Sequence, residues 1–313
     1  MSKETVVVTG ATGRVGTRIV QALLAAGYAV HALAHSALAA GHPLAHEPIA
    51  LSVLNMAALP EQEVTSFLQS VQPTALVHAA ALSDVADCER QPALALLLNA
   101  RVTALLARLC AKQHLHFVMI SSEQVFAGSA SPHRLYCEDD PVGPLNWYGK
   151  SKVQAEIATR QACASHSAWT ICRLSVVYGL ADAPGLWRPD FVQWVHSALA
   201  RGERLRIVAD QVNSPLFIDD LCAILVAIVG QRLTGIYHVA GRTPLSRYEC
   251  ARQVARAYGL DERLLLPMPS AELDLGACRP LNVGLCIEKV RDTTGIHPRS
   301  IEAGLAACRS LRV

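Results

Sequence analysis

Residues 5–16 read TVVVTGATGRVG, an apolar run that leads into three glycines at regular spacing. The apolar run predicts a buried strand, and RVGTRIVQALLAAG (14–27) after it predicts an amphipathic helix. Between them, Gly10 allows a tight turn and Gly13 lets the backbone approach a pyrophosphate. Gly16 lets the helix pack closely on the strand. Because amide groups at a helix N-terminus bind phosphates, the stretch predicts a dinucleotide site at the start of a βαβ unit.

The alternation of apolar runs and helical patterns continues through the first half of the chain. Strands separated by helices predict βαβ units and a parallel sheet. The fold class that we predict is α/β, a Rossmann-type doubly wound parallel sheet with a smaller C-terminal α/β substrate-binding part. The further strand-like runs are 28–34, 74–81, 116–122 and 169–179, and the helix-like segments are 61–73, 92–113 and 151–166.

The pattern changes after about residue 180, and a Pro-rich stretch lies around 267–280. We therefore predict a chain of two parts. Residues 1–173, with about 206–242 returning to them, form an NAD(P)-binding Rossmann domain. Residues of about 174–205 and 243–313 form the substrate-binding part.

Composition and charge argue against several classes of protein. Hydrophobic residues make up 51% of the chain, yet the longest apolar stretches, 93–98 and 223–229, are too short to span a bilayer. The N-terminus shows no secretory pattern. The 28 basic and 26 acidic residues are interspersed, which does not favour nucleic acid. We expect a cytoplasmic protein that binds a small molecule and neither nucleic acid nor membrane.

Cysteines and histidines do not predict a metal site. The ten cysteines contain no CxxC pair, so reduced thiols packed as small hydrophobic groups are expected. Four histidines lie close in sequence, but a four-residue spacing aligns ligands only on a helix, and these lie in a strand and a loop. The histidines are His31, His35, His42 and His46.

The end of the second strand bears on the choice between NAD and NADP. An acidic residue there would bind the ribose hydroxyls of NAD, but the sequence has Ala34, His35 and Ser36. Arg14 lies inside the glycine loop, where it either pairs with a 2′-phosphate or is a solvated surface residue. With Thr12 and Val15 as further loop contacts, this pattern favours NADP(H) over NAD(H).

A Ser, Tyr and Lys set suggests acid–base chemistry. The strand HFVMISS ends in Ser122, Tyr148 follows 26 residues later, and Lys152 lies four residues beyond it. A spacing of four places Tyr148 and Lys152 on one helix face. A phenol with an ordinary pKa of about 10 is a poor acid near neutral pH. A neighbouring ammonium group would lower that pKa and make the phenol a useful proton donor.

The order of these motifs resembles that of extended short-chain dehydrogenases/reductases. Within that class, three further segments look like the dTDP-4-dehydrorhamnose reductase family, which also contains the regulatory β subunit of methionine adenosyltransferase. The superfamily resemblance rests on TGATGRVG, VHAAA (77–81), SSEQVF (121–126), YGKSK and RLSVVYG (173–179). The family resemblance rests on PLNWYGKSKVQAE, DQVNSPLFIDDL (210–221) and RPLNVGL (279–285).

This resemblance implies roles for individual residues. Tyr148 would donate a proton to a carbonyl oxygen that Ser122 also holds, and Lys152 would in addition hold the nicotinamide ribose. Asn99 either steadies the cofactor site or only satisfies a backbone group of its helix. The segment beside the cofactor would be Ala79, Ala80 and Ala81.

The substrate side is less fully specified. Arg279 suits a nucleotide diphosphate, because its planar fork pairs with phosphate oxygens, although a surface role is an equal alternative. Ser83 and Asp84 would line the pocket, and Asp84 could instead cap a helix. Glu123 is a further candidate for substrate binding. The roles of Arg173 and Asp210 stay open, and Trp147 is interpreted as a packing residue.

Two departures from the wider class limit the choice of reaction. Sugar-nucleotide dehydratases place Asp-Glu after the catalytic hydroxyl, whereas this chain has Glu123 and Gln124. A Gln amide cannot accept a proton, which disfavours elimination. Phe217 stands where many extended members have a His.

We therefore expect NADPH-dependent reduction of a keto group, foremost on a 4-keto-6-deoxy sugar nucleotide. The alternatives are a sugar-nucleotide epimerase, a non-sugar ketone reductase, or an NADP-binding regulatory subunit. A homodimer is one assembly that we consider.

Overall fold

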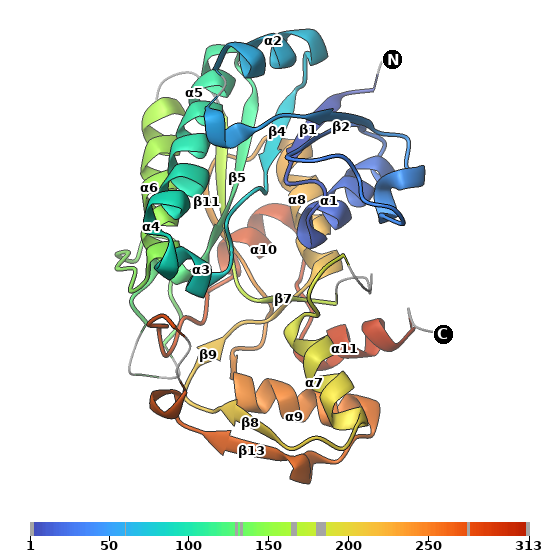
Figure 1. Cartoon of the computed structure of the whole chain (residues 1–313), viewed down its shortest axis with the longest axis vertical. Coiled ribbons are helices and arrows are strands. Elements are labelled where there is room, and N and C mark those ends of the chain that lie inside the picture. Colours follow the sequence, from blue (N-terminus) through green and yellow to red (C-terminus); the bar gives the residue numbers. More distant parts are fainter. Residues whose placement is uncertain are drawn as a thin grey trace.

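The computed structural model describes residues 3–59, 61–128, 131, 134–163, 168–179, 186–273 and 276–310. At its centre is a seven-stranded parallel sheet, which confirms the predicted fold class (Figure 1). The strand order reverses at β1, and a crevice opens at such a reversal. The strands in order are β11 (Gly235–Val239), β6 (Trp169–Leu174), β5 (His116–Ser122), β4 (Ala75–His78), β1 (Thr5–Thr9), β2 (Ala29–Ala34) and β3 (Ala50–Val53).

Helices cover both faces of the sheet. Because successive strand residues point to opposite faces, Val6 and Val8 lie in one hydrophobic core and Val7 in the other. This arrangement explains why TVVVT is apolar without alternation, as expected for a strand buried on both sides. The first face is covered by α1 (Arg14–Ala25) and α8 (Ile218–Gln231), and the second by α2 (Glu61–Val71), α5 (Val102–Lys112) and α6 (Trp147–Cys163).

One helical run is longer than the apolar stretches of the sequence suggested. Pro92–Lys112 is long and apolar enough to cross a membrane by length and composition, and 56% of its most apolar window is buried inside the structure. Its buried residues pack in the core between α5, α6 and the sheet. Core packing therefore accounts for the apolar composition of this run. It consists of α4 (Pro92–Ala95), the π-helical segment Leu96–Arg101 and α5.

The apolar run 169–179 is not a single strand. It continues the main sheet as β6 and then leaves it, so that β7 (Val177–Tyr178) pairs with β10 (Leu216–Phe217). At the break, the Ser175 hydroxyl accepts a hydrogen bond from the backbone amide of Ser214 at 3.0 Å. Apolar periodicity did not reveal the break, because both strands are buried.

The smaller part of the molecule lies beyond the carboxyl ends of the sheet strands (Figure 1). The predicted LRIV strand, β8 (Leu205–Val208), pairs there with β13 (Leu265–Met268) and does not return to the main sheet. Within the range of about 206–242, α8 and β11 are the elements that pack with the main sheet. This part also contains α7 (Phe191–Ala200), β9 (Val212–Asn213), β12 (Leu245–Ser246), α9 (Arg247–Tyr258) and α11 (Ile301–Ser310).

The remaining elements are short. They are α3 (Val85–Arg90), α10 (Glu288–Thr294) and the 3-10 turns Pro43–His46, Met56–Ala58, Glu123–Val125, Glu262–Leu264 and Ser270–Glu272. β3 lies between the predicted strand 28–34 and the predicted helix 61–73, where the apolar pattern predicted no strand. The end of the predicted helix 151–166, residues 164–166, lies outside the described residues.

Candidate active site

A cavity of about 850 Å³ opens at the carboxyl ends of the sheet strands, where the strand order reverses at β1. Parallel α/β folds place their ligands at this reversal of strand order. The cavity brings together most of the residues that the sequence singled out. Its lining includes Gly10, Thr12, Gly13, Arg14, Val15, Gly16, His35, Ala79, Ala80, Ala81, Ser83, Ser122, Tyr148 and Lys152.

The glycine loop forms one wall of this cavity. Gly10 has φ of +67°, and a Cβ atom there would lie 2.6 Å from the backbone nitrogen of Ala80. At Gly16 a Cβ atom would lie 2.0 Å from the carbonyl oxygen of Gly10. Gly13 caps α1 without a side-chain hydrogen bond, so no side chain blocks the amide groups of the first turn. These features fit the pyrophosphate of a nicotinamide dinucleotide.

Arg14 lines the cavity and is held by ion-pair and hydrogen-bond contacts, so it is not the solvated surface residue of the alternative interpretation. Its guanidinium forms an ion pair with Asp190 at 3.3 Å and donates to the carbonyl of Arg188. Because Asp190 is the N-cap of α7, Arg14 ties the glycine loop to the smaller part of the molecule. Its side chain is therefore not a solvated surface group, and Asp190 and the Arg188 carbonyl use part of its hydrogen-bonding capacity. The expectation of NADP(H) therefore rests mainly on the end of β2, which carries no acidic residue and where His35 lines the cavity.

Ser122, Tyr148 and Lys152 meet where β5 ends against the start of α6. Gly149 permits this approach, because a Cβ atom there would lie 2.1 Å from the carbonyl oxygen of Gln124. The side chain of Asn146 accepts a hydrogen bond from the Gly149 amide at 2.9 Å and fixes the first turn of the helix. The close packing of α6 on the segment after β5 thus explains why the second residue of YGKSK is a glycine.

Burial controls the protonation of the two groups in α6. It raises the pKa of Tyr148 to about 12, although a side-chain hydrogen bond with Ser122 opposes the increase. It also lowers the pKa of Lys152 to about 8, against the opposing charge of Glu156. The pKa of Tyr148 in this structure is therefore higher than its ordinary value, whereas a lower one was expected from the Tyr148–Lys152 spacing. The neutral phenol that results is the form that donates a proton.

Lys152 is held in place by the strand beside it. Its ammonium group donates a hydrogen bond to the Ile120 carbonyl at 2.9 Å. The Nζ atom lies 5.9 Å from the centre of the Tyr148 ring. Tyr148 and Lys152 therefore occupy one helix face, as their spacing predicted.

Asn99 does not line the cavity but bonds to residues close to it. Its amide group exchanges hydrogen bonds with both backbone groups of Leu82, at 2.8 and 2.9 Å, and donates to the Ser151 hydroxyl at 2.9 Å. These bonds fit both of its interpretations, since Asn99 satisfies the backbone groups of Leu82 and also steadies Ser151. Its π-helical segment is a local widening of the helix, a distortion that is frequent near functional sites.

Glu123 is buried directly after Ser122 in the chain. Its Oε1 atom accepts a hydrogen bond from the Asn213 amide at 2.5 Å, and its Oε2 atom has no partner among the described residues. Burial raises the pKa of this carboxyl group to about 7, although hydrogen bonds and the charge of Arg247 oppose the increase. Glu123 is therefore poised between its two protonation states at neutral pH.

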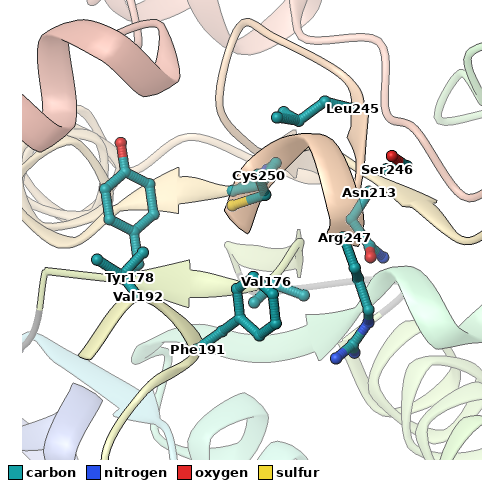
Figure 2. A pocket seen from close by; sticks show the side chains of 10 residues that line it. Val176, Tyr178, Phe191, Val192, Asn213, Leu245, Ser246, Arg247 and Cys250 are labelled. Carbon is teal, nitrogen blue, oxygen red and sulfur yellow. The ribbon is translucent and has the colours of Figure 1, made fainter. Parts of the chain in front are cut away.

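Sequence reasoning missed Arg247, the first residue of α9. Figure 2 shows Arg247 and Asn213 together at one side of a small, largely apolar pocket of about 20 Å³, with Tyr178 at the other side. That pocket has room for about one water molecule and is too small for a substrate. Tertiary structure alone brings Arg247 near Glu123, 124 residues away in the chain (247 − 123), so no local motif could have indicated it.

Arg247 and Arg279 form a pair of neighbouring cations. Burial lowers the pKa of Arg279, and the charge of Arg247 lowers it further. The Nε atoms of both residues are buried without a hydrogen-bond partner in the described part of the chain. Two neighbouring guanidinium groups with unused donors favour an anionic ligand.

Several other residues have structural roles. Asp84 caps α3 by accepting a hydrogen bond from the Asp87 amide at 3.0 Å, which fits its alternative interpretation. Arg173 forms a buried ion pair with Glu156 at 2.8 Å. Asp210 accepts hydrogen bonds from Ser270.

Gln124 and Phe217 also have clear places in the structure. Gln124 accepts a hydrogen bond from the Asn146 amide at 3.1 Å. Phe217 is fully buried against Tyr178, so this position is part of the hydrophobic core. Among the described residues, no group of His, Cys, Asp and Glu side chains could hold a metal ion.

Comparisons with known proteins agree with this geometry. The family model of the RmlD substrate binding domain matches residues 4–311. The spore coat polysaccharide biosynthesis protein SpsK of Bacillus subtilis is 31% identical over 297 residues, covering 94% of this chain and 93% of that protein. The dTDP-4-dehydrorhamnose reductase of Mycolicibacterium smegmatis is 30% identical over 308 residues, covering 98% of this chain and 82% of that protein.

A solved structure with the same fold is the dTDP-4-dehydrorhamnose reductase of Bacillus anthracis, in complex with NADP. Its TM-score is 0.84 at 24% identity, and the match covers 99% of this chain and all of that one.

Proposed function

The chain belongs to the RmlD substrate binding domain family, and from that premise we propose that it is an NADPH-dependent reductase of a keto group on a nucleotide sugar. The substrate that we favour is a 4-keto-6-deoxy sugar nucleotide. The reductase relative from Mycolicibacterium smegmatis supports this substrate class, because it aligns along nearly the whole chain.

The observation that carries the proposal is the placement of Ser122, Tyr148 and Lys152 beside the glycine loop. All three line the same cavity as Gly10 and Gly13. A dinucleotide whose pyrophosphate lies on the loop can extend along this cavity toward the three side chains. This arrangement suits hydride chemistry at a carbonyl carbon next to a proton donor.

Each of the three side chains has a defined task. The bound dinucleotide supplies the hydride. Because its pKa is raised to about 12, Tyr148 is neutral near neutral pH and can donate its proton to the substrate oxygen. Ser122, which hydrogen-bonds to Tyr148, can also hold that oxygen and stabilise its developing charge. Lys152, fixed by the Ile120 carbonyl, provides a positive charge on the same helix face and can bind the ribose.

Arg247 and Arg279 support a nucleotide diphosphate as the anionic portion of the substrate. Neither Nε atom has a partner among the described side chains and backbone groups, so both arginines retain hydrogen-bond donors for phosphate oxygens. Arg247 also acts on Glu123, which directly follows Ser122 in the chain. The two cations therefore lie on the substrate side of the catalytic set.

The test is the oxidation of NADPH by purified protein with dTDP-4-dehydrorhamnose, in a panel that includes other keto sugar nucleotides and hydrophobic ketones. We expect Tyr148→Phe to lower kcat by about 100-fold or more while NADPH still binds, since it removes only the proton donor. Tyr248→Phe on α9 is the matched control and should keep wild-type activity.

Other results would redirect the proposal. Wild-type turnover by Tyr148→Phe would refute this mechanism. Binding of NADPH without turnover of any ketone would favour a regulatory subunit. A parallel titration with NADH tests the cofactor preference, and equal affinity for both cofactors would remove the NADP assignment.

A further inference from the structure

Two cysteines that are distant in sequence lie opposite each other on neighbouring segments of the chain. Tyr136 and Leu285 form an isolated parallel bridge, and each is followed directly by a cysteine. The Cys286 amide donates a hydrogen bond to the Tyr136 carbonyl at 2.8 Å. Because residues in register on parallel strands lie side by side, this bridge places Cys137 opposite Cys286.

The two thiols are in contact and one of them is open to solvent. A side-chain hydrogen bond links Cys137 and Cys286. Cys137 is exposed and Cys286 is partly buried. The Cys286 thiol also donates to the Glu288 carboxylate, with a distance of 2.6 Å from Sγ to Oε2. The pair thus combines an accessible sulfur, a second sulfur within reach and a nearby proton acceptor.

The other cysteines lack this combination. Cys110 and Cys163 lie near each other, but both are buried in the core. Cys278 is exposed, but no contact with another thiol is recorded for it within the described residues. Cys137 and Cys286 are therefore the pair that a dissolved oxidant can reach.

We propose that Cys137 and Cys286 are an oxidation site, at which a small peroxide closes a disulfide between two segments that are distant in sequence. This inference goes beyond the reductase function and does not depend on it. The bridge joins the loop that leads into α6 to the segment that carries Arg279.

The chemistry balances with hydrogen peroxide as the two-electron oxidant. The Cys137 sulfur attacks one peroxide oxygen, the O–O bond breaks, and a sulfenic acid and one water form. The Cys286 sulfur then attacks the Cys137 sulfur, the S–O bond breaks, and a second water leaves as the S–S bond forms. Both sulfurs are oxidised and both peroxide oxygens are reduced.

The surroundings assign the order of the two sulfurs. Burial and the hydrogen bond to Glu288 raise the pKa of Cys286 to about 12, which makes it the poorer first nucleophile. The exposed Cys137 therefore reacts first with peroxide. Glu288 can accept the Cys286 proton during the second step, because it already accepts a hydrogen bond from that thiol.

Existing contacts show that little movement is required. The Asn282 amide donates to the Arg134 carbonyl at 2.9 Å, and the Asn146 amide donates to the Cys278 carbonyl at 2.9 Å. These two bonds hold the segments 134–146 and 278–286 together near the cysteine pair. A covalent link there would close a loop of about 149 residues and restrain the unfolded chain.

The test uses the full chain, treated with a small excess of hydrogen peroxide and then digested under non-reducing conditions. Mass spectrometry should find a peptide that contains both Cys137 and Cys286. The thiol titre in denaturant should fall from ten to eight. The thermal midpoint should rise by about 5 °C and return after treatment with dithiothreitol.

Two variants and one control make the result specific. Cys137→Ser and Cys286→Ser should each abolish the cross-linked peptide and the thermal shift, whereas Cys278→Ser should retain both. A titre that stays at ten, a bridge that involves Cys278, or Cys137 oxidised to sulfinic acid without a bridge would overturn the proposal.

Discussion

The ammonium group of Lys152 lies almost entirely out of solvent, only 3% exposed, and burial lowers its pKa to about 8. Tyr148, one helical turn away, has a pKa raised to about 12 and therefore stays uncharged near neutral pH. Both pKa values lie above neutral pH, and that of Lys152 is the lower of the two. In the pH range just above neutral, Lys152 is the group of this pair that changes charge.

This difference predicts the pH dependence of the reduction. Lys152 is charged below about pH 8 and neutral above it, so kcat/KM should fall about tenfold per pH unit above that value. The measurement is a kcat/KM profile from about pH 6 to about pH 10. Lys150→Met, which changes an exposed lysine of the same helix, should show the same profile. A rate that stays constant up to about pH 10 would contradict the assignment to Lys152.

Glu123 predicts a pH dependence of stability. Its pKa is raised to about 7 in the folded chain, from an ordinary value of 4.5. Between these values the folded chain binds more protons than the unfolded chain, so stability falls as pH rises through this window. The loss is at most ~3 kcal/mol, because each pKa unit corresponds to about 1.4 kcal/mol.

The check is urea denaturation at about pH 5 and about pH 8. Glu123→Gln keeps an acceptor for Asn213 but removes the charge, so it should lose less stability than the wild type between the two values. Glu63→Gln, at an exposed position of α2, serves as the control and should follow the wild type. Equal pH dependence of Glu123→Gln and wild type would show that Glu123 is not the responsible group.

At the scale of elements, the contact between α6 and the end of β5 determines where the catalytic side chains lie. Gly149 faces the carbonyl of Gln124 so closely that even a methyl group has no room. Asn146 fixes the start of the helix through the Gly149 amide and also bonds to Gln124. Asn99 in the neighbouring helical run holds Ser151 in the same turn. The position of Tyr148 thus depends on the packing of two helices and a strand end.

Gly149→Ala should therefore move the first turn of α6. The new Cβ atom would lie 2.1 Å from a backbone oxygen, so the helix must shift away from β5. We expect kcat/KM to fall by about 100-fold, because displacements of about 1 Å have effects of this size, and the thermal midpoint to drop. Lys150→Ala, at an exposed position of the same turn, controls for helix propensity and should remain active. Full activity in Gly149→Ala would mean that the contact is unnecessary.

At the scale of the whole molecule, the substrate side is assembled from both parts of the chain. Glu123 follows a strand of the main sheet, whereas Arg247 begins a helix of the smaller part. Arg14 crosses in the opposite direction, from the glycine loop to Asp190 at the start of α7. The relative placement of the two parts therefore decides the distance between the catalytic set and the arginine pair.

This assembly predicts that Arg247 affects the sugar nucleotide and not the cofactor. Arg247→Gln should raise KM for the nucleotide sugar by about tenfold to 100-fold, the usual effect of losing a charged hydrogen bond. The Kd for NADPH should not change, since the glycine loop belongs to the other part. Arg252→Gln on the same helix removes an arginine that is paired with Glu262 and should keep the wild-type KM. An unchanged KM in Arg247→Gln would exclude the proposed phosphate contact.

Local patterns determined much of this protein. TVVVTGATGRVG predicted its strand, turn and helix, because the conformational freedom of Gly10 and the apolar faces of the flanking elements act over a few residues. The spacing of Tyr148 and Lys152 predicted their common helix face for the same reason. The family resemblance placed Ser122 beside them, and the structure brings these residues to one cavity.

Only the tertiary structure decided the remaining features. Burial raised the pKa of Tyr148 where a lower value was expected. Asp190 formed an ion pair with Arg14, and Glu123 came to lie near Arg247. Desolvation and long-range charge depend on which distant residues surround a group, and a local pattern does not contain that information. The sequence by itself therefore determined the dinucleotide-binding fold and the order of Ser122, Tyr148 and Lys152 along the chain. The packing of the two parts decided the protonation of these side chains and which residues form the proposed substrate side.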